Sequence, residues 1–156
     1  MNIFVVDPDT KICAQALDDL RLNKMIIETA QLLSTALRSH GSTAQIYNIT
    51  HLNHPCAIWA RLNSENYLWL LKYMEELVAE RVSRTGRSHK SADLIPILKS
   101  ESYLIPIGQL TMWPNCTNFK HIKDVHEAYK VALIDKWLND KRQPKWTNQE
   151  RPAWAN

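Results

Sequence analysis

Several patterns that mark well-known protein classes are scarce in this chain of 156 residues. Only three glycines occur, and alternating stretches typical of strands are rare, which favours a helical fold. The cysteines, Cys13, Cys56 and Cys116, are widely spaced and form neither a CxxC pair nor a Cys/His spacing typical of a metal site. We therefore expect three reduced thiols in a cytoplasmic protein, with no metal and no cofactor.

Long apolar runs and dense basic tracts are also missing. The apolar start at residues 2–6 reaches Asp7 too early for a signal peptide, and we expect no membrane attachment. The net charge of +3 permits a nucleic-acid partner, but any binding site for it must be assembled by the fold. No GxGxxG, P-loop, HExxH or GxSxG motif occurs, so kinase, dehydrogenase, zinc-peptidase and serine-hydrolase functions have no motif support.

Caps, prolines and apolar spacing predict one all-α domain over residues 1–156, a compact helical bundle. After a short extended N-terminus at residues 2–6, helices are expected over about 11–40, with an interruption near Asp18, and over 54–61, 65–84, 91–99 and 118–139. The segments 42–54 and 101–118 should connect them. The tail 140–156 contains two tryptophans and should pack as an irregular arm.

The most informative stretch is residues 17–33, where two stripes recur at helical spacing. Apolar residues form one face, and the second face carries Arg21, Lys24, Glu28 and Gln31. A carboxylate among cations on one rigid helix suits a site that processes a polyanion, with Glu28 as charge stabiliser or proton carrier. A solvated helix with a Lys24–Glu28 salt bridge gives the same pattern.

A second cluster surrounds the predicted helix starts near residues 54 and 64. His54 stands at a helix N-terminus, which can bind an anion, and Arg61 adds a cation. The side chain of Asn66 can read a base edge, and Tyr67 and Trp69 offer flat rings. The alternative is a capped amphipathic helix whose aromatic residues fill the core.

A third group of side chains flanks Gly86. Arg84, Arg87, His89 and Lys90 could form a phosphate clamp around this bend, and an exposed loop would have the same composition.

Several short segments together suggest a family. The apolar start is followed by Asp19-Leu20-Arg21 and, seven residues after Arg21, by Glu28; the tail contains Arg151-Pro152-Ala153-Trp154 and Gln143-Pro144-Lys145-Trp146. These segments resemble the pyrimidine-dimer DNA glycosylases of the phage endonuclease V type. The stretches Asn53-His54-Pro55-Cys56 and Asn66-Tyr67-x-Trp69 are similar to small phage-encoded proteins, which implies a host cytoplasm. The resemblance implies a compact helical enzyme in which an amine attacks C1′ of a flipped nucleotide and a Schiff base permits strand cleavage.

The resemblance also implies residue roles. Glu28 corresponds to the family's catalytic carboxylate, Arg21 stands at its DNA-contacting histidine, and Gln31 stands at a basic position. The family nucleophile is the α-amine of a small residue exposed by removal of Met. Because Asn2 is bulky for that processing, we expect Met1 to be retained and to offer its own amine, one residue out of register.

Two features keep other mechanisms open. Lys24 is a second candidate amine if burial depresses its pKa. Ile27 replaces a family arginine, which weakens the expected DNA binding and lyase chemistry. Water directed by Glu28, without a lyase step, is therefore a variant of the hypothesis.

We predict an enzyme that cleaves an N-glycosidic bond in DNA, with Glu28, Met1 and Lys24 as catalytic residues. The residues expected to bind substrate are Arg21, Gln31, His54, Arg61, Asn66, Tyr67, His89 and Lys90. The alternatives are a hydrolase or transferase that acts on a nucleotide or nucleoside, and a non-catalytic protein-binding module anchored by Trp146 and Trp154. The sequence leaves the target base and the oligomeric state open.

Overall fold

The computed structural model describes residues 1–155, and every regular element in this part of the chain is a helix. The elements are α1 (Thr10–Ala16), α2 (Asp19–Ser39), α3 (Pro55–Leu62), α4 (Ser64–Thr85), α5 (Ile95–Ser100) and α6 (Val125–Asn139), with the 3-10 turns η1 (Lys90–Leu94), η2 (Ser102–Leu104) and η3 (Ala153–Ala155). The predicted all-α class is confirmed. Among the described residues, no helix is both long enough and apolar enough to cross a membrane.

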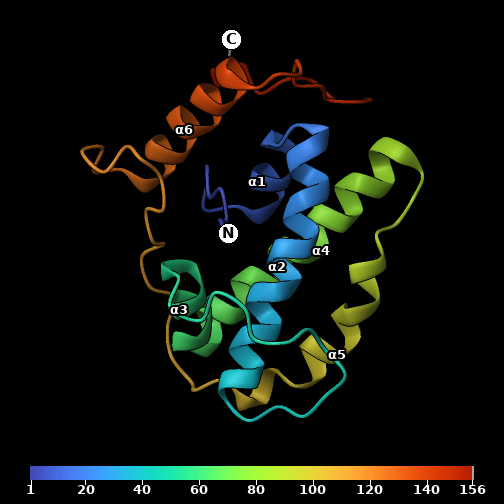
Figure 1. Ribbon diagram of the computed structural model, residues 1–156, viewed down its shortest axis with the longest axis vertical. Coiled ribbons are helices and arrows are strands. Elements are labelled where there is room, and N and C mark those ends of the chain that lie inside the picture. Colours follow the sequence, from blue (N-terminus) through green and yellow to red (C-terminus); the bar gives the residue numbers. More distant parts are fainter. Residues whose placement is uncertain (156) are drawn as a thin grey trace.

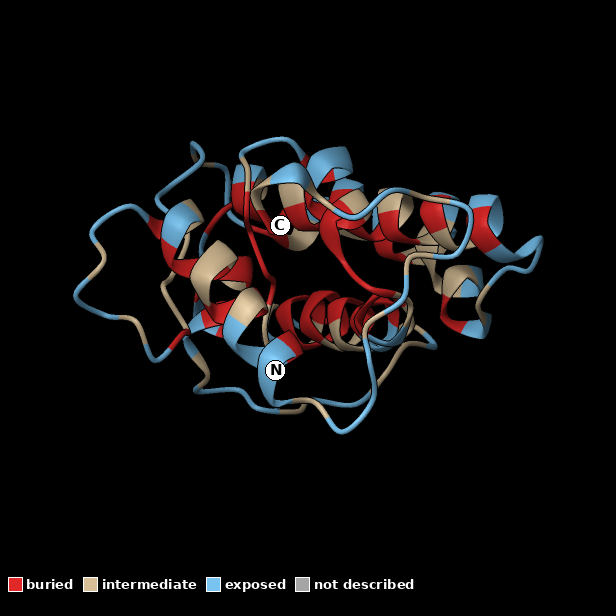
Figure 2. Ribbon diagram, turned by 90° about the horizontal axis from the view of Figure 1, so that it is seen from above, coloured by how far each residue is buried: buried red, intermediate tan, exposed pale blue. Residues whose placement is uncertain are grey.

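The two long helices, α2 and α4, pack together at the centre of the molecule (Figure 1). Their facing side chains, including Met25, Leu33, Leu70 and Leu77, are almost fully buried. Burial of each such side chain contributes about 1.5–3 kcal/mol. Helices α1 and α3 pack on this pair, and α6 lies at one end, with the N-terminal segment between it and α2 (Figure 1). Buried residues concentrate on the inner helix faces, whereas most connecting loops are exposed (Figure 2).

The predicted interruption near Asp18 separates α1 from α2 and is confirmed. Asp18 is the N-cap of α2, and its Oδ2 accepts a 3.4 Å hydrogen bond from the Arg21 amide. Its Oδ1 accepts bonds from the Arg21 guanidinium at 2.9 Å and from Nε1 of Trp137 at 2.8 Å. A buried carboxylate with these donors fixes the start of α2 against α6.

The N-terminal segment is buried. It is not extended throughout, although the sequence predicted an extended segment over residues 2–6. Phe4 has a φ of 42°, and Asn2 Oδ1 accepts hydrogen bonds from the amides of Ile3 at 2.7 Å and Phe4 at 3.1 Å. The apolar pattern indicated burial correctly, and Ile3 and Val5 are fully buried. The side chain of Asn2 closes a turn through these two bonds. The turn bends the chain, and Met1 lies over α2.

The middle helices begin close to the predicted positions. His54 caps α3, Asn63 caps α4, and Gly86, with a φ of 69°, ends α4. The stretch predicted as one helix over 91–99 divides into η1 and α5, with Pro96 in the first turn of α5.

The predicted start of the last helix at residue 118 is wrong, because α6 begins at Val125. Asp124 caps it by accepting hydrogen bonds from the amides of His126 at 2.8 Å and Glu127 at 3.2 Å. Upstream, Asn115 Oδ1 accepts bonds from the amide and hydroxyl of Thr117, which closes a turn in place of a helix.

The C-terminal arm packs irregularly on α6, as predicted. Trp146 and Trp154 are half-buried, and their rings contact Trp137 at centroid distances of 5.1 and 5.8 Å. These tryptophans complete the core in the structure, which disfavours the alternative in which they are exposed anchors for a partner.

Candidate active site

A cavity of about 340 Å³ lies between the N-terminal segment, α2 and the end of α6. Its lining residues are Met1, Asn2, Phe4, Leu20, Arg21, Lys24, Met25, Glu28, Lys136 and Asp140. The fold therefore brings together the residues predicted as catalytic, Met1, Lys24 and Glu28. It adds Lys136 of α6 and Asp140, which follows α6, and both lie more than 100 positions beyond Glu28 in the sequence.

Glu28 is largely enclosed, with 12% of its side chain exposed. Its Oε2 accepts a 3.1 Å hydrogen bond from the Asn2 amide and lies 3.7 Å from the α-amino nitrogen of Met1. Its Oε1 lies 3.4 Å from Nζ of Lys24. The carboxylate thus holds the N-terminal segment on α2 by charge and hydrogen bonding.

Lys24 lies on the outer side of the same helix face. Its side chain is 70% exposed, so the burial that would make this lysine a nucleophile is absent. The Met1 side chain, in contrast, is 2% exposed, which anchors the adjoining α-amine beside Glu28. Of the two candidate amines, the structure favours that of Met1.

Arg21 lines the cavity, but two carboxylates neutralise its charge. Its Nη1 lies 2.9 Å from Oδ1 of Asp18 and 2.8 Å from Oδ2 of Asp140. Burial acts to lower the pKa of Arg21, and hydrogen bonds to Asp140 and Asp18 outweigh it, so the pKa lies above its ordinary value. Arg21 therefore joins α2 to the end of α6, and its guanidinium is less available to DNA than the sequence suggested.

His54 lies near this group without lining the cavity. Partial burial lowers the pKa of His54, the charges of the Met1 amine and of His51 lower it further, and Glu28 opposes them. These effects together favour the neutral form of the ring. Its Nδ1 accepts a 3.1 Å bond from the Cys56 amide, which caps α3.

Asn66 and Tyr67, predicted to contact a base, are both fully buried. The Asn66 amide group bonds to the Trp59 carbonyl at 2.9 Å and to the hydroxyl and backbone amide of Thr111. The Tyr67 hydroxyl donates to the Leu98 carbonyl at 2.8 Å. Both side chains fit the core interpretation, because their polar atoms already have partners.

The other predicted binding residues lie outside the cavity. Arg61 donates to the Leu52 carbonyl and lines a separate hollow. His89 caps η1, Lys90 is exposed beside it, and Gln31 is half-buried one turn beyond Glu28. None of these four side chains lines the cavity.

The sequence analysis missed Asn2, Phe4, Lys136 and Asp140 as cavity residues. Asp140 follows the last residue of α6, and Lys136 lies one turn earlier. Neither stands in a distinctive local pattern, and only the packing of α6 against the N-terminal segment places them at the cavity. Asn2 could have been found from the sequence, because an asparagine side chain often accepts a hydrogen bond from a nearby backbone amide and so forms a turn.

The family model for pyrimidine dimer DNA glycosylases matches residues 1–94. The chain belongs to this family. No curated protein and no solved structure matches the chain. Within the family match lie α1 to α4, with Met1, Lys24 and Glu28, whereas Lys136 and Asp140 lie beyond it. Membership in the pyrimidine dimer DNA glycosylase family supports a glycosylase-like function with DNA as substrate, and it confirms the family resemblance.

Proposed function

We propose that this protein is a pyrimidine dimer DNA glycosylase that works through the α-amine of Met1 and the carboxylate of Glu28. The observation that carries the proposal is their 3.7 Å separation in a cavity of about 340 Å³. A volume of this order is typical of sites for small ligands, about 300–1,000 Å³, and suits one flipped nucleoside.

The first step joins the amine to the sugar. The lone pair of the neutral Met1 amine attacks C1′, and the bond from C1′ to the base nitrogen breaks with its electron pair leaving on the base. The amine gives up a proton to the Glu28 carboxylate, which is close enough to accept it. A proton from water neutralises the departing base.

Glu28 serves a second purpose, as an anion beside a developing cation. Bond breaking at C1′ builds positive charge on the sugar, and a fixed carboxylate stabilises it most in a site shielded from water. With 12% of its side chain exposed, Glu28 meets that condition. The bond from the Asn2 amide keeps the carboxylate in place.

Strand cleavage can follow from the same adduct. The proton held by Glu28 passes to the ring oxygen O4′ as the C1′–O4′ bond breaks, which restores the carboxylate. The C1′–N bond becomes an iminium, which acidifies the hydrogen on C2′. Removal of that proton by Glu28 expels the 3′ phosphate, and water then hydrolyses the Schiff base and frees the amine. This lyase step is part of the proposal, and it requires the primary amine rather than activated water.

The decisive experiment uses end-labelled duplex with one cyclobutane thymine dimer, incubated with and without borohydride. Borohydride reduces an iminium to a stable amine, so a trapped protein–DNA adduct marks the Schiff base. We expect strand cleavage without borohydride and an adduct with it. Peptide mapping should place the adduct on the Met1 amine. No base release from this duplex would reject the proposal.

Two variants identify the nucleophile. An extension of two residues before Met1 removes the free amine from this position and should abolish trapping. Lys24→Arg keeps a cation beside Glu28 but removes the lysine amine, and it should leave trapping unchanged. An adduct on Asn2 would show that Met1 is removed, since the Asn2 nitrogen already lies 3.1 Å from Glu28. Base release without any adduct would indicate water as nucleophile.

A further inference from the structure

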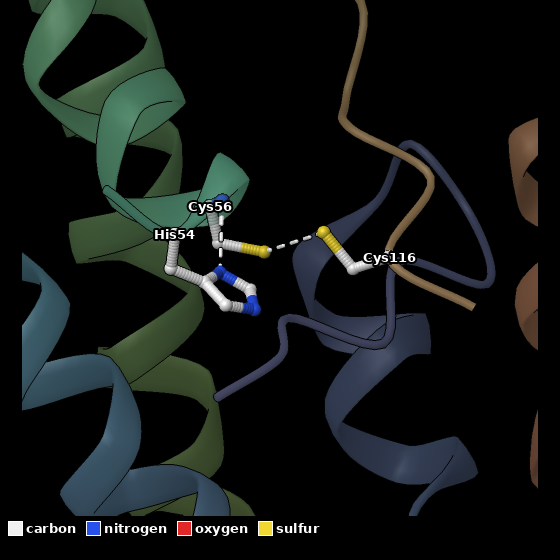
Figure 3. A group of neighbouring side chains, drawn as sticks. All are labelled: His54, Cys56 and Cys116. Atoms are coloured by element: carbon white, nitrogen blue, oxygen red, sulfur yellow. Dashed lines mark hydrogen bonds between the residues drawn. The ribbon is translucent and has the colours of Figure 1, made fainter. Parts of the chain in front are cut away.

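Three metal-ligating side chains meet beside the proposed active site. The donor atoms of His54, Cys56 and Cys116 all lie within 4.8 Å of one another, and the two sulfurs are 3.4 Å apart (Figure 3). The sequence showed no Cys/His spacing of a metal site, because Cys116 is 60 positions from Cys56. The fold supplies the proximity by laying the turn before α6 against the start of α3.

Local hydrogen bonds hold the His54 ring and the Cys116 backbone in place. The cap bond from the Cys56 amide to Nδ1 of His54 requires the tautomer with its proton on Nε2. That tautomer leaves a lone pair on Nδ1, and the ring edge with both nitrogens faces the sulfurs (Figure 3). Cys56 is fully buried. The Cys116 amide donates to the Tyr129 hydroxyl, which itself donates to the Pro114 carbonyl at 2.8 Å.

We propose that His54, Cys56 and Cys116 bind a divalent zinc ion, with a water molecule in the fourth position. Thiolate and imidazole donors select zinc over magnesium or calcium, which prefer oxygen. Tetrahedral bonds of about 2.3 Å from zinc to sulfur place two sulfurs about 3.8 Å apart. The observed 3.4 Å therefore needs only a small outward movement.

The exchange of bonds at this site is favourable. Zinc displaces the two thiol protons, so two thiolates and Zn²⁺ form a neutral group in a partly buried place. The zinc–nitrogen bond replaces the cap bond at Nδ1, so one hydrogen bond is exchanged for a metal–ligand bond.

The ion would tie two parts of the chain together. His54 and Cys56 belong to the segment that matches the glycosylase family, whereas Cys116 lies beyond it. The turn at Cys116 leads into α6, which brings Lys136 and Asp140 to the cavity. Zinc at this point would hold α6 in position, independently of which nucleophile acts.

Cobalt titration of the full-length, reduced, metal-free protein tests the site. Co²⁺ bound by cysteine thiolates gives a near-ultraviolet charge-transfer band that free Co²⁺ lacks. We expect the band to saturate at one Co²⁺ per chain and to disappear on addition of Zn²⁺. Zn²⁺ should also raise the Tm of the wild-type protein.

The variants separate ligand loss from general damage. Cys116→Ser, and His54→Asn, which retains a capping side chain, should weaken Co²⁺ binding more than about 100-fold, beyond the 10–100-fold cost of losing a supporting partner. Cys13→Ala is the matched control. The Cys13 thiol is buried and donates to the Asp7 carbonyl, and it forms no hydrogen bond with His54, Cys56 or Cys116. The Cys13→Ala variant should therefore bind Co²⁺ as tightly as the wild type does.

Three results would overturn the metal site. One is a wild-type protein without the charge-transfer band, and another is a Cys116→Ser variant that binds Co²⁺ as tightly as the wild type. The third is a Cys56–Cys116 disulfide in the protein as isolated, found by peptide mapping, together with no Co²⁺ binding after reduction. That outcome would assign the pair to redox chemistry.

Discussion

Three nitrogen atoms surround the carboxylate of Glu28, and they differ in character. The Asn2 amide is a fixed donor, the Met1 amine is the proposed nucleophile, and the Lys24 ammonium is mostly exposed. A neutral amide side chain could still accept the Asn2 bond, but it could neither take a proton nor balance a sugar cation. A single substitution can therefore separate the chemical role of Glu28 from its structural one.

Glu28→Gln should reduce base release at least about 100-fold, the lower end of what proton transfer by a positioned group contributes. Affinity for the thymine-dimer duplex and the free energy of unfolding should each change by no more than about 1 kcal/mol, since the glutamine oxygen can still accept the Asn2 bond and Lys24 of the lost ion pair is exposed. Single-turnover kinetics, fluorescence anisotropy and urea unfolding measure the three quantities. Glu65→Gln, an exposed carboxylate on α4, is the control for the lost charge. Equal turnover in Glu28→Gln would remove Glu28 from the mechanism.

Sequence spacing could place Arg21, Lys24 and Glu28 on one face of a helix, because the helical period fixes which residues are neighbours. It could not show that Asp140 takes up the charge of Arg21, since that pairing depends on where α6 packs. The same limit applies to Asn66, whose polarity suggested a base contact. A buried side chain with satisfied bonds and an exposed one with free bonds look alike in a sequence.

At the scale of elements, the first turn of α2 is tied to α4 and to the C-terminal arm through Asp19. Its Oδ1 lies 3.0 Å from Nη1 of Arg84, and its Oδ2 accepts a 2.7 Å bond from the Thr147 hydroxyl. Burial acts to raise the pKa of Asp19, but hydrogen bonds from Thr147 and Arg84 outweigh it, so the pKa lies below its ordinary value. The charged form of Asp19 therefore stabilises the fold.

Asp19→Asn should lower the free energy of unfolding by about 1–2 kcal/mol at pH 7, as expected for lost hydrogen bonds to a charged group. Because the folded pKa is depressed, this stabilisation is complete above the unfolded value of about 3.9 and is lost as the pH falls through the folded pKa. The difference between the two proteins should therefore shrink below pH 4. Urea unfolding at several pH values measures it, and a difference that grows on acidification would contradict the assignment.

Helix boundaries were predictable where a capping side chain precedes an apolar periodic stretch, as at Asn63 before α4. The start of α6 was not, because apolar residues such as Ile122 continue the helical spacing upstream of the true cap at Asp124. The bonds of Asn115 with Thr117 compete with the helix there. Such local closure is a matter of side-chain geometry, which composition does not reveal.

At the scale of the whole molecule, the cavity depends on contacts between the two ends of the chain. Val5 accepts a 2.9 Å bond from the His126 ring, and Asp18 accepts one from Trp137. The all-α class followed from composition and periodicity, the proximity of Lys24 to Glu28 followed from helical spacing, and that of Met1 to Glu28 followed from the family resemblance. The contribution of α6 did not, because contacts across more than 100 residues are set by packing and leave no local signal.

Lys136 is the exposed cation that α6 adds to the cavity, and it offers a contact for a DNA phosphate. Lys136→Gln should lower affinity for lesion duplex about tenfold at low salt, or about 1.4 kcal/mol. Loss of one phosphate contact should also reduce the slope of log affinity against log salt by about 0.9. Fluorescence anisotropy over a salt series measures both. Lys72→Gln removes an exposed lysine of α4 that does not line the cavity, and it should change neither quantity. An unchanged slope in Lys136→Gln would mean that Lys136 contacts no DNA phosphate.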